Sequence, residues 1–306
     1  MKLVRLWSEA PVPEIPEWLD HAYSYPSFSD FGKVMHLTWR GPCNSLERLD
    51  QASSLIYSSL HAQNVRYLEM SIGIGAYPYP VHETLDAFRS NIPDGMTVRI
   101  IGGLSRDRNL EVIHPAGLAY IRAEGLDGVD LHGLESVGDP SAFRDLYDIA
   151  RSRGLILKAH AGEFGGPESV EEVLDKLGVD RIQHGVRGIE SDRLVQRYVE
   201  DSITLDLCPW SNVKLGVYGS LEDHPVGRLH RAGVRVTVST DDPTPFGQTI
   251  SEEYAWLITK CGLTVREAAD IARNGFEVAR ISAAERDRAV VEIEALVEEY
   301  GDERRG

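Results

Sequence analysis

The chain has 306 residues, of which 42% are hydrophobic and 26% are charged, a composition that excludes a disordered or a collagen-like protein. Its 48 acidic residues outnumber its 32 basic residues, so the formal net charge is −16 at pH 7. A balance this negative argues against a broad surface for nucleic acid or for an anionic membrane. We therefore expect neither kind of partner.

Short β-branched segments alternate with amphipathic segments of helical length after about residue 60. Seven strands are predicted, at residues 65–71, 97–104, 128–132, 155–160, 181–184, 203–208 and 234–240. Helices are predicted at residues 141–153, 169–177, 192–200, 225–232 and 282–300. The alternation indicates a parallel sheet with crossover helices, and an eighth strand near the N-terminus would close a (β/α)8 TIM barrel. The rival fold, an open doubly wound sheet, lacks its glycine-rich phosphate-binding fingerprint. We expect one barrel domain over residues 1–306.

The cellular compartment is predicted from cysteine usage and from the N-terminus. Three cysteines lie far apart in the sequence and form neither a disulfide framework nor a paired metal-binding motif. The N-terminal residues lack the apolar segment of a signal peptide, and no run approaches the roughly 18 apolar residues of a membrane span. We expect a cytoplasmic protein.

Titratable side chains follow several of the predicted strands. His160 ends one strand and begins the segment HAGE, His184 ends the next, and Asp241 and Asp242 follow the last. In a barrel these strand ends form one face, and that face carries active sites. We therefore expect these side chains to converge.

The residue types suggest their roles. His160 and Asp241, on distant strands, could share one metal ion, because imidazole and carboxylate are usual ligands of zinc or iron. Glu163, three residues after His160, could donate or accept a proton. His184 could orient or deprotonate a water. Asp242 cannot point the same way as Asp241 on a strand, so it is expected to contact substrate or a histidine behind the metal.

Together these segments resemble the adenosine deaminase family. The matching segments are YLEM at 67, DLHG at 130, HAGE at 160, RIQHGVRG at 181, LCPWSNVKLG at 207 and VSTDDPTPFG at 238. They occur in the order of the family, over roughly residues 25–280, and residues 281–306 are expected to form a C-terminal helix. The resemblance implies a (β/α)8 barrel with one zinc ion, which activates a water to attack C6 of a purine and release ammonia.

The resemblance also implies roles for six residues. His160 and Asp241 look like zinc ligands, and Glu163 looks like the acid that protonates the purine ring. His184 looks like the residue beside the metal-bound water. Asp242 looks like a contact to substrate and water. Gly133 looks like a backbone contact to the base.

One family motif is missing: the family carries an HxH pair of zinc ligands on its first strand, and this sequence has no HxH. One placement of that strand is residues 2–9, with Arg5 and Trp7 near the two histidine positions and Glu9 matching an acid that follows. The other is residues 33–40, with His36 in place and Thr38 replacing its partner. The first placement is favoured, because helical spacing is found around the start of the second. The apolar residues with this spacing are Phe28, Phe31 and Met35.

The missing motif leaves the metal and the reaction open. His184 could become a third ligand beside His160 and Asp241, a set that also suits iron or manganese. Alternatively no metal binds, and Arg5 pairs with Asp241 or Glu163. Three functions follow: hydrolytic deamination of a purine nucleoside or related aminated ring, a metal-poor or metal-free enzyme of a biosynthetic pathway, or a non-catalytic nucleoside-binding barrel. The second would use the acid–base chemistry of Glu163, His184 and Asp242.

Overall fold

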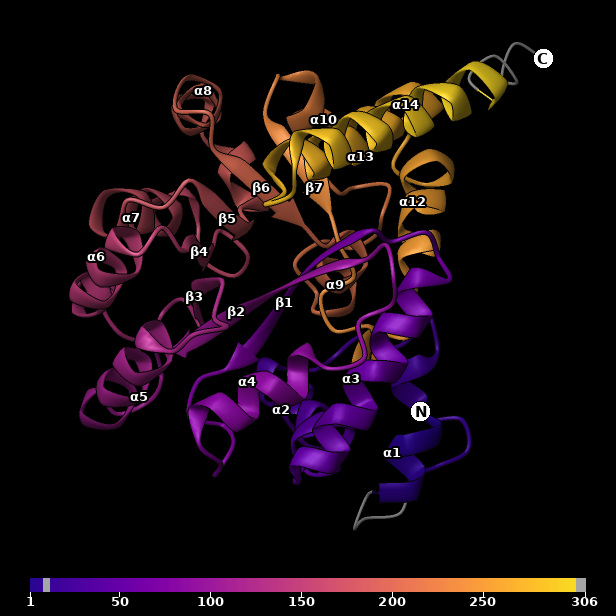
Figure 1. Ribbon diagram of the computed structural model, residues 1–306. Coiled ribbons are helices and arrows are strands. Elements are labelled where there is room, and N and C mark those ends of the chain that lie inside the picture. The colour runs from indigo at the N-terminus through magenta and orange to yellow at the C-terminus, as the bar shows by residue number, and fades with distance from the viewer. Residues whose placement is uncertain (8–11, 301–306) are drawn as a thin grey trace.

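A computed structural model describes residues 1–7 and 12–300 of the chain. Its centre is a seven-stranded parallel sheet in which every strand pairs with the next strand along the chain (Figure 1). The strands are β1 (Tyr67–Gly73), β2 (Thr97–Ser105), β3 (Gly128–His132), β4 (Ile156–Ala161), β5 (Arg181–His184), β6 (Thr204–Leu207) and β7 (Arg235–Val238). This order is that of a (β/α)8 barrel, and all seven predicted strands are confirmed to within a few residues.

Helices connect consecutive strands and cover the outside of the sheet. The longer ones are α2 (Phe28–Met35), α3 (Leu46–His61), α4 (Val81–Arg89), α5 (Leu110–Arg122), α6 (Arg144–Ser152), α7 (Pro167–Leu177), α8 (Asp192–Glu200), α12 (Ile250–Thr259), α13 (Val265–Val278) and α14 (Ala283–Tyr300). The short ones are α1 (Lys2–Trp7), η1 (Glu17–Leu19), η2 (His36–Arg40), η3 (Pro140–Phe143), η4 (Val186–Glu190), α9 (Pro209–Lys214), α10 (Val226–Arg231) and α11 (Pro243–Phe246). Figure 1 shows α5 to α8 following one another around one side of the sheet, with α13 and α14 crossing near β6 and β7.

Both sequence placements of the first strand are wrong. Lys2–Trp7 forms the helix α1, and residues 33–40 end α2 and form the π-helical turn η2. Glu9 lies outside the described residues. The predicted helical spacing in α2 is correct, because Phe31 is buried and stacks on Phe246 with ring centroids 5.0 Å apart. In residues 1–7 and 12–300 no eighth strand pairs with β1 or β7.

The inside of the sheet holds a cluster of charges below the predicted site. It consists of Glu69, Lys158, Arg181 and Asp206, which we call the interior ion cluster. Lys158 Nζ lies 2.5 Å from Glu69 Oε2 and 2.7 Å from Asp206 Oδ2. Lys158 precedes His160 by two residues on β4, so both side chains point to the same face of the sheet. The two therefore form successive layers of the barrel interior.

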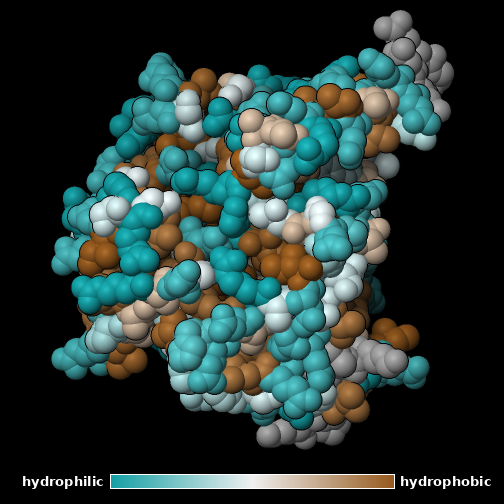
Figure 2. Space-filling view, in the orientation of Figure 1, coloured by the Kyte–Doolittle hydropathy of each residue, from teal (hydrophilic) through white to brown (hydrophobic). Residues whose placement is uncertain are grey.

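The outer surface is consistent with the composition. Hydrophilic side chains cover much of the visible rim, whereas apolar side chains show between the elements near the middle of the view (Figure 2). Within the described ranges no helix combines the length and the apolar character needed to cross a bilayer. All three cysteines are free, at Cys43, Cys208 and Cys261.

Candidate functional site

The carboxyl ends of the strands bring the predicted residues to one face of the barrel. His160 lies in β4, His184 ends β5, and Asp241 follows β7. His184 and Asp241 both have left-handed backbone conformations, with φ of 66° and 55°. Such conformations are uncommon for residues other than glycine, and they cluster at functional sites.

His160 is held by a buried carboxylate that sequence reasoning did not select. Its Nδ1 lies 2.9 Å from Oδ2 of Asp130, a side chain of β3 with no exposed surface. Burial lowers the pKa of His160, but the charge and hydrogen bond of Asp130 outweigh burial and raise this pKa to about 9. Arg106 Nη2 donates to the His160 carbonyl oxygen at 2.9 Å. The rings of His160 and His184 lie 5.2 Å apart, measured between centroids.

The turn that carries Glu163 is fixed by Glu135. The Glu135 carboxylate accepts backbone N–H bonds from Gly162 at 2.6 Å, Glu163 at 2.9 Å and Phe164 at 2.8 Å. Burial raises the pKa of Glu135, but these bonds and a hydrogen bond from Ser169 outweigh burial and leave it below its usual value. Nothing in the sequence pattern marks Glu135, because its partners become neighbours only when β3 and β4 pair.

The Glu163 side chain is buried and faces His184 and Asn212. Asn212 Nδ2 donates to Glu163 Oε1 at 2.9 Å, and His184 Nδ1 lies 3.5 Å from the same oxygen. Burial and the nearby charge of Asp241 raise the pKa of Glu163 well above its usual value. Burial lowers the pKa of His184 to about 4. The two shifts favour a protonated carboxyl beside a neutral imidazole.

The two consecutive aspartates have different surroundings. Ser211 Oγ donates to Asp241 Oδ2 at 2.6 Å. Asp242 is the residue before α11, and burial together with the charge of Asp241 raises its pKa to about 8. Asp242 can thus hold or release a proton near neutral pH.

Gly133 occupies a position that requires glycine. It follows β3 with φ of 104°, and a Cβ there would lie 3.3 Å from Arg106 Cγ. Its backbone lies at the same strand-end face as His160. The predicted contact between Gly133 and a purine base stays a prediction.

One group of potential metal ligands comes together among residues 1–7 and 12–300. It consists of His184, Cys208 and Asp241, whose ligand atoms all lie within 4.8 Å of one another. His160 is not a member of this group, so the predicted set of His160, His184 and Asp241 is not assembled as such. Cys208 was missed because a lone cysteine after a strand has no ligand-like spacing.

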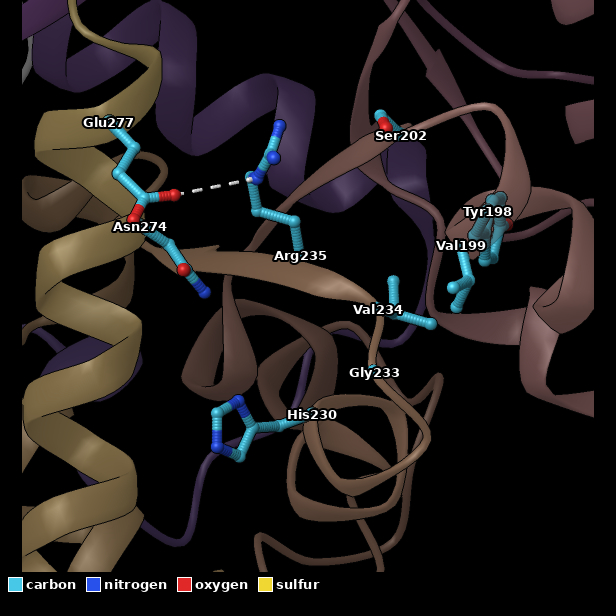
Figure 3. A pocket seen from close by; sticks show the side chains of 9 residues that line it. All are labelled: Tyr198, Val199, Ser202, His230, Gly233, Val234, Arg235, Asn274 and Glu277. Atoms are coloured by element: carbon cyan, nitrogen blue, oxygen red, sulfur yellow. Dashed lines mark ion pairs between the residues drawn. The ribbon is translucent and has the colours of Figure 1, made fainter.

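A separate hollow of about 300 Å³ lies away from this face (Figure 3). Its lining includes Gly233, Val234 and Arg235, at the start of β7, whereas the predicted site gathers at the other ends of the strands. In Figure 3 Arg235 pairs with Glu277 at 3.8 Å and His230 lies beside the hollow. The hollow includes no predicted site residue.

The chain is similar in sequence to known proteins. The sequence profile of the family described as Adenosine deaminase matches residues 24–296. The adenine deaminase of Hahella chejuensis is 36% identical over 197 residues, which cover 64% of this chain and 58% of that protein. The adenine deaminase of Streptomyces coelicolor is 35% identical over 247 residues, which cover 76% of this chain and 72% of that protein.

Solved structures of similar fold include deaminases as well. The crystal structure of adenine deaminase from Arthrobacter aurescens has a TM-score of 0.86 and 25% identity, covering 97% of this chain and 94% of that chain. The N6-methyl-AMP deaminase of Arabidopsis thaliana, with a TM-score of 0.75 and 20% identity, covers 89% of this chain and 85% of that chain and shares the fold. The matched profile spans most of the chain and includes every predicted site residue. The chain therefore belongs to the adenosine deaminase family.

Proposed function

We propose that this chain is a hydrolase that deaminates a 6-aminopurine, with adenine as the first candidate substrate. The relatives from Hahella chejuensis and Streptomyces coelicolor, and the structure from Arthrobacter aurescens, are adenine deaminases by name. The observation that carries the proposal is the buried Glu163 carboxyl, which faces His184 on the strand-end face of a barrel of this family.

Glu163 acts as the general acid. Its pKa is held above the usual range by burial and by Asp241, so at neutral pH the carboxyl carries a proton. A protonated carboxyl in a dry pocket can give this proton to a ring nitrogen of the purine while water adds to the ring. Loss of the amino group as ammonia then completes the hydrolysis.

The other residues hold substrate and water. His184 is neutral, because burial keeps its pKa near 4, and it can bind a water without adding positive charge. Asp242, whose pKa is raised to about 8 by burial and Asp241, can exchange a proton with substrate or water near neutral pH. Gly133 offers backbone to the base, since it has no side chain to interfere.

The residues present fit a divalent metal such as zinc. Metal-binding histidines usually place the second ring nitrogen on a carboxylate, and His160 does so on Asp130. We propose His160 and Asp241 as ligands, and the buried thiol of Cys208, which lies near Asp241, as the alternative donor. What a metal supplies when bound is a water of lowered pKa, a better nucleophile at neutral pH. A metal-free acid–base enzyme is the second candidate, because no HxH strand occurs in the sequence.

A substrate panel tests the proposal. Purified protein with added zinc is incubated with adenine, adenosine and AMP, and ammonia release is measured beside the change in ultraviolet absorbance. Turnover of at least one of these is expected, with adenine the fastest. Absence of ammonia from all three, in protein shown to be folded and metal-loaded, would contradict the proposal. The proposal also includes a small-molecule substrate, a cytoplasmic location and a single barrel domain over residues 1–306.

A further inference from the structure

A chain of hydrogen bonds leads from the backbone through His224 and Asn212 to Glu163. The Val226 N–H at the start of α10 donates to His224 Nδ1 at 3.3 Å. Because Nδ1 accepts this bond, a neutral His224 carries its hydrogen on Nε2. His224 Nε2 lies 3.2 Å from Asn212 Oδ1, so it donates to that oxygen. The backbone thus selects one tautomer of His224.

The tautomer of His224 selects the orientation of the Asn212 amide. With Oδ1 facing His224, the two hydrogens of Asn212 Nδ2 are directed elsewhere. Nδ2 donates to Glu163 Oε1 at 2.9 Å and lies 3.4 Å from His184 Nδ1. An amide nitrogen can only donate, so both Glu163 Oε1 and His184 Nδ1 act as acceptors. With the amide reversed, Asn212 Oδ1 would face Glu163 Oε1, and Oε1 would then have to carry the carboxyl proton.

We propose that His224 is a positioning residue that acts through Asn212 to decide which atoms of Glu163 and His184 carry a hydrogen. Since Oε1 of Glu163 accepts the bond from Asn212, Oε2 is the oxygen left to hold a carboxyl proton. Since Nδ1 of His184 accepts, the hydrogen of this ring sits on Nε2. The acid and the imidazole therefore present donors rather than acceptors to a ligand. The inference rests on the proposed function, because it concerns the direction of proton donation by Glu163.

Burial favours a single arrangement of the hydrogen bonds around His224 and Asn212. His224 is 5% exposed and Asn212 is fully buried, so water does not compete for the hydrogen bonds between them. Besides Asn212 and the Val226 N–H, His224 neighbours the Tyr218 ring, 5.2 Å away between centroids, and the positive charge of Arg228 acts on it. Burial disfavours a second proton on His224, and so does the positive charge of Arg228. No carboxylate among these neighbours opposes them.

Two substitutions of His224 separate the donor from the bulk of the ring. His224→Gln keeps an N–H donor near Nε2, whereas His224→Phe keeps a ring but loses the donor. His230→Gln is the matched control, because His230 lies on α10, which begins two residues after His224, and borders the hollow of Figure 3. With adenine as substrate, kcat for His224→Phe is expected to fall about 10- to 100-fold with little change in KM. His224→Gln is expected to stay within a few-fold of the wild type.

Nuclear magnetic resonance of protein with 15N-labelled histidine tests the inference without turnover. The ring nitrogens of His184, assigned with the help of a His184→Asn variant, are expected to show the Nε2–H tautomer in the wild type. The same tautomer is expected in His224→Gln, and a tautomer mixture or Nδ1–H in His224→Phe. An unchanged His184 tautomer in a folded His224→Phe variant would overturn the inference. If no aminopurine is turned over but the tautomer responds as expected, the proposed function fails and the positioning role stands.

Discussion

Two layers of the same barrel interior hold similar side chains in opposite protonation states. In the interior ion cluster two carboxylates face two cations: Arg181 Nη2 lies 2.8 Å from Asp206, and Lys158 contacts both Asp206 and Glu69. Burial raises the pKa values of Glu69 and Asp206, but the two cations outweigh it and hold both below the usual range. These carboxylates are therefore ionised.

One layer further out the carboxyl groups outnumber their cations. Burial and Asp241 raise the pKa of Glu163 and bring that of Asp242 to about 8, and Asp130 has already paired with His160. The Glu163 side chain is 8% exposed, close to the 5% of Glu69 and the 6% of Asp206, so depth alone does not decide the ionisation of these carboxyl groups. The local balance between carboxylates and cations decides ionisation. An excess of carboxyl groups favours protonated carboxyls at the candidate active site.

The largest expected effect comes from removing the proton of the outer layer. Glu163→Gln keeps the shape and the hydrogen bond from Asn212 but has no acidic proton. We expect kcat/KM for adenine to fall by about 10²–10⁴-fold, because general acid catalysis is lost. Thermal unfolding should be unchanged or shifted upward, since no buried charge is created. The control is Glu168→Gln, an exposed residue of α7, which should behave as wild type. Equal activity of both variants would refute the acid role of Glu163.

The inner layer should respond in stability rather than in chemistry. Lys158→Met leaves Glu69 and Asp206 with Arg181 alone, so we expect a loss of about 3–5 kcal/mol in the free energy of unfolding. Urea denaturation measures this loss. Lys176 is the matched control: it also contacts two carboxylates, Asp139 and Glu172, but at the surface. Lys176→Met should have no measurable effect, and a comparable loss in both variants would show that burial of the cluster is irrelevant.

A third unbalanced carboxyl tests the same rule through pH. Burial raises the pKa of Glu253 to about 8, and this carboxyl forms no ion pair with any residue of 1–7 or 12–300. The folded state thus keeps a proton that the unfolded state releases above its ordinary pKa of 4.5. Stability from this group is therefore full at pH below 4.5 and is lost as pH rises toward 8. Glu253→Gln should remove this decline, worth about 2 kcal/mol or more over the window. Urea denaturation at several pH values checks it, and parallel curves for the variant and wild type would contradict the assignment.

The smallest change is expected in metal binding by a Cys208 variant. This test distinguishes a metal site in which Asp241 is joined by His160 from one in which it is joined by Cys208. Cobalt(II) binding is followed by visible and near-ultraviolet absorbance. Asp241→Asn should abolish binding, Asp130→Asn should weaken it about 10- to 100-fold, and Cys208→Ser should leave it nearly unchanged. Cys261→Ser is the cysteine control. A thiolate charge-transfer band in the wild type that is missing from the cobalt-loaded Cys208→Ser variant would instead make Cys208 a ligand. No binding at all would favour the metal-free enzyme.

Much of the fold followed from local pattern. The seven strands and the helices between them were predicted because a buried parallel strand reads as a short β-branched run and a covering helix as an amphipathic segment. The strand-end positions of His160, His184 and Asp241 followed from that topology alone. The first strand was predicted wrongly: a short apolar segment suits either period, and no neighbouring strand was known to pair with it.

By itself, the sequence therefore determined the strand order, the family and the face on which the titratable groups meet, because each is written in contiguous residues. Only the tertiary structure decided their partners: Asp130 on His160, Glu135 on the turn at Glu163, and Asn212 between His224 and Glu163. These contacts join residues 12 to 49 positions apart in the chain. Hydrogen-bond partners, and the protonation states they impose, depend on distances and burial that exist only when the strands stand side by side.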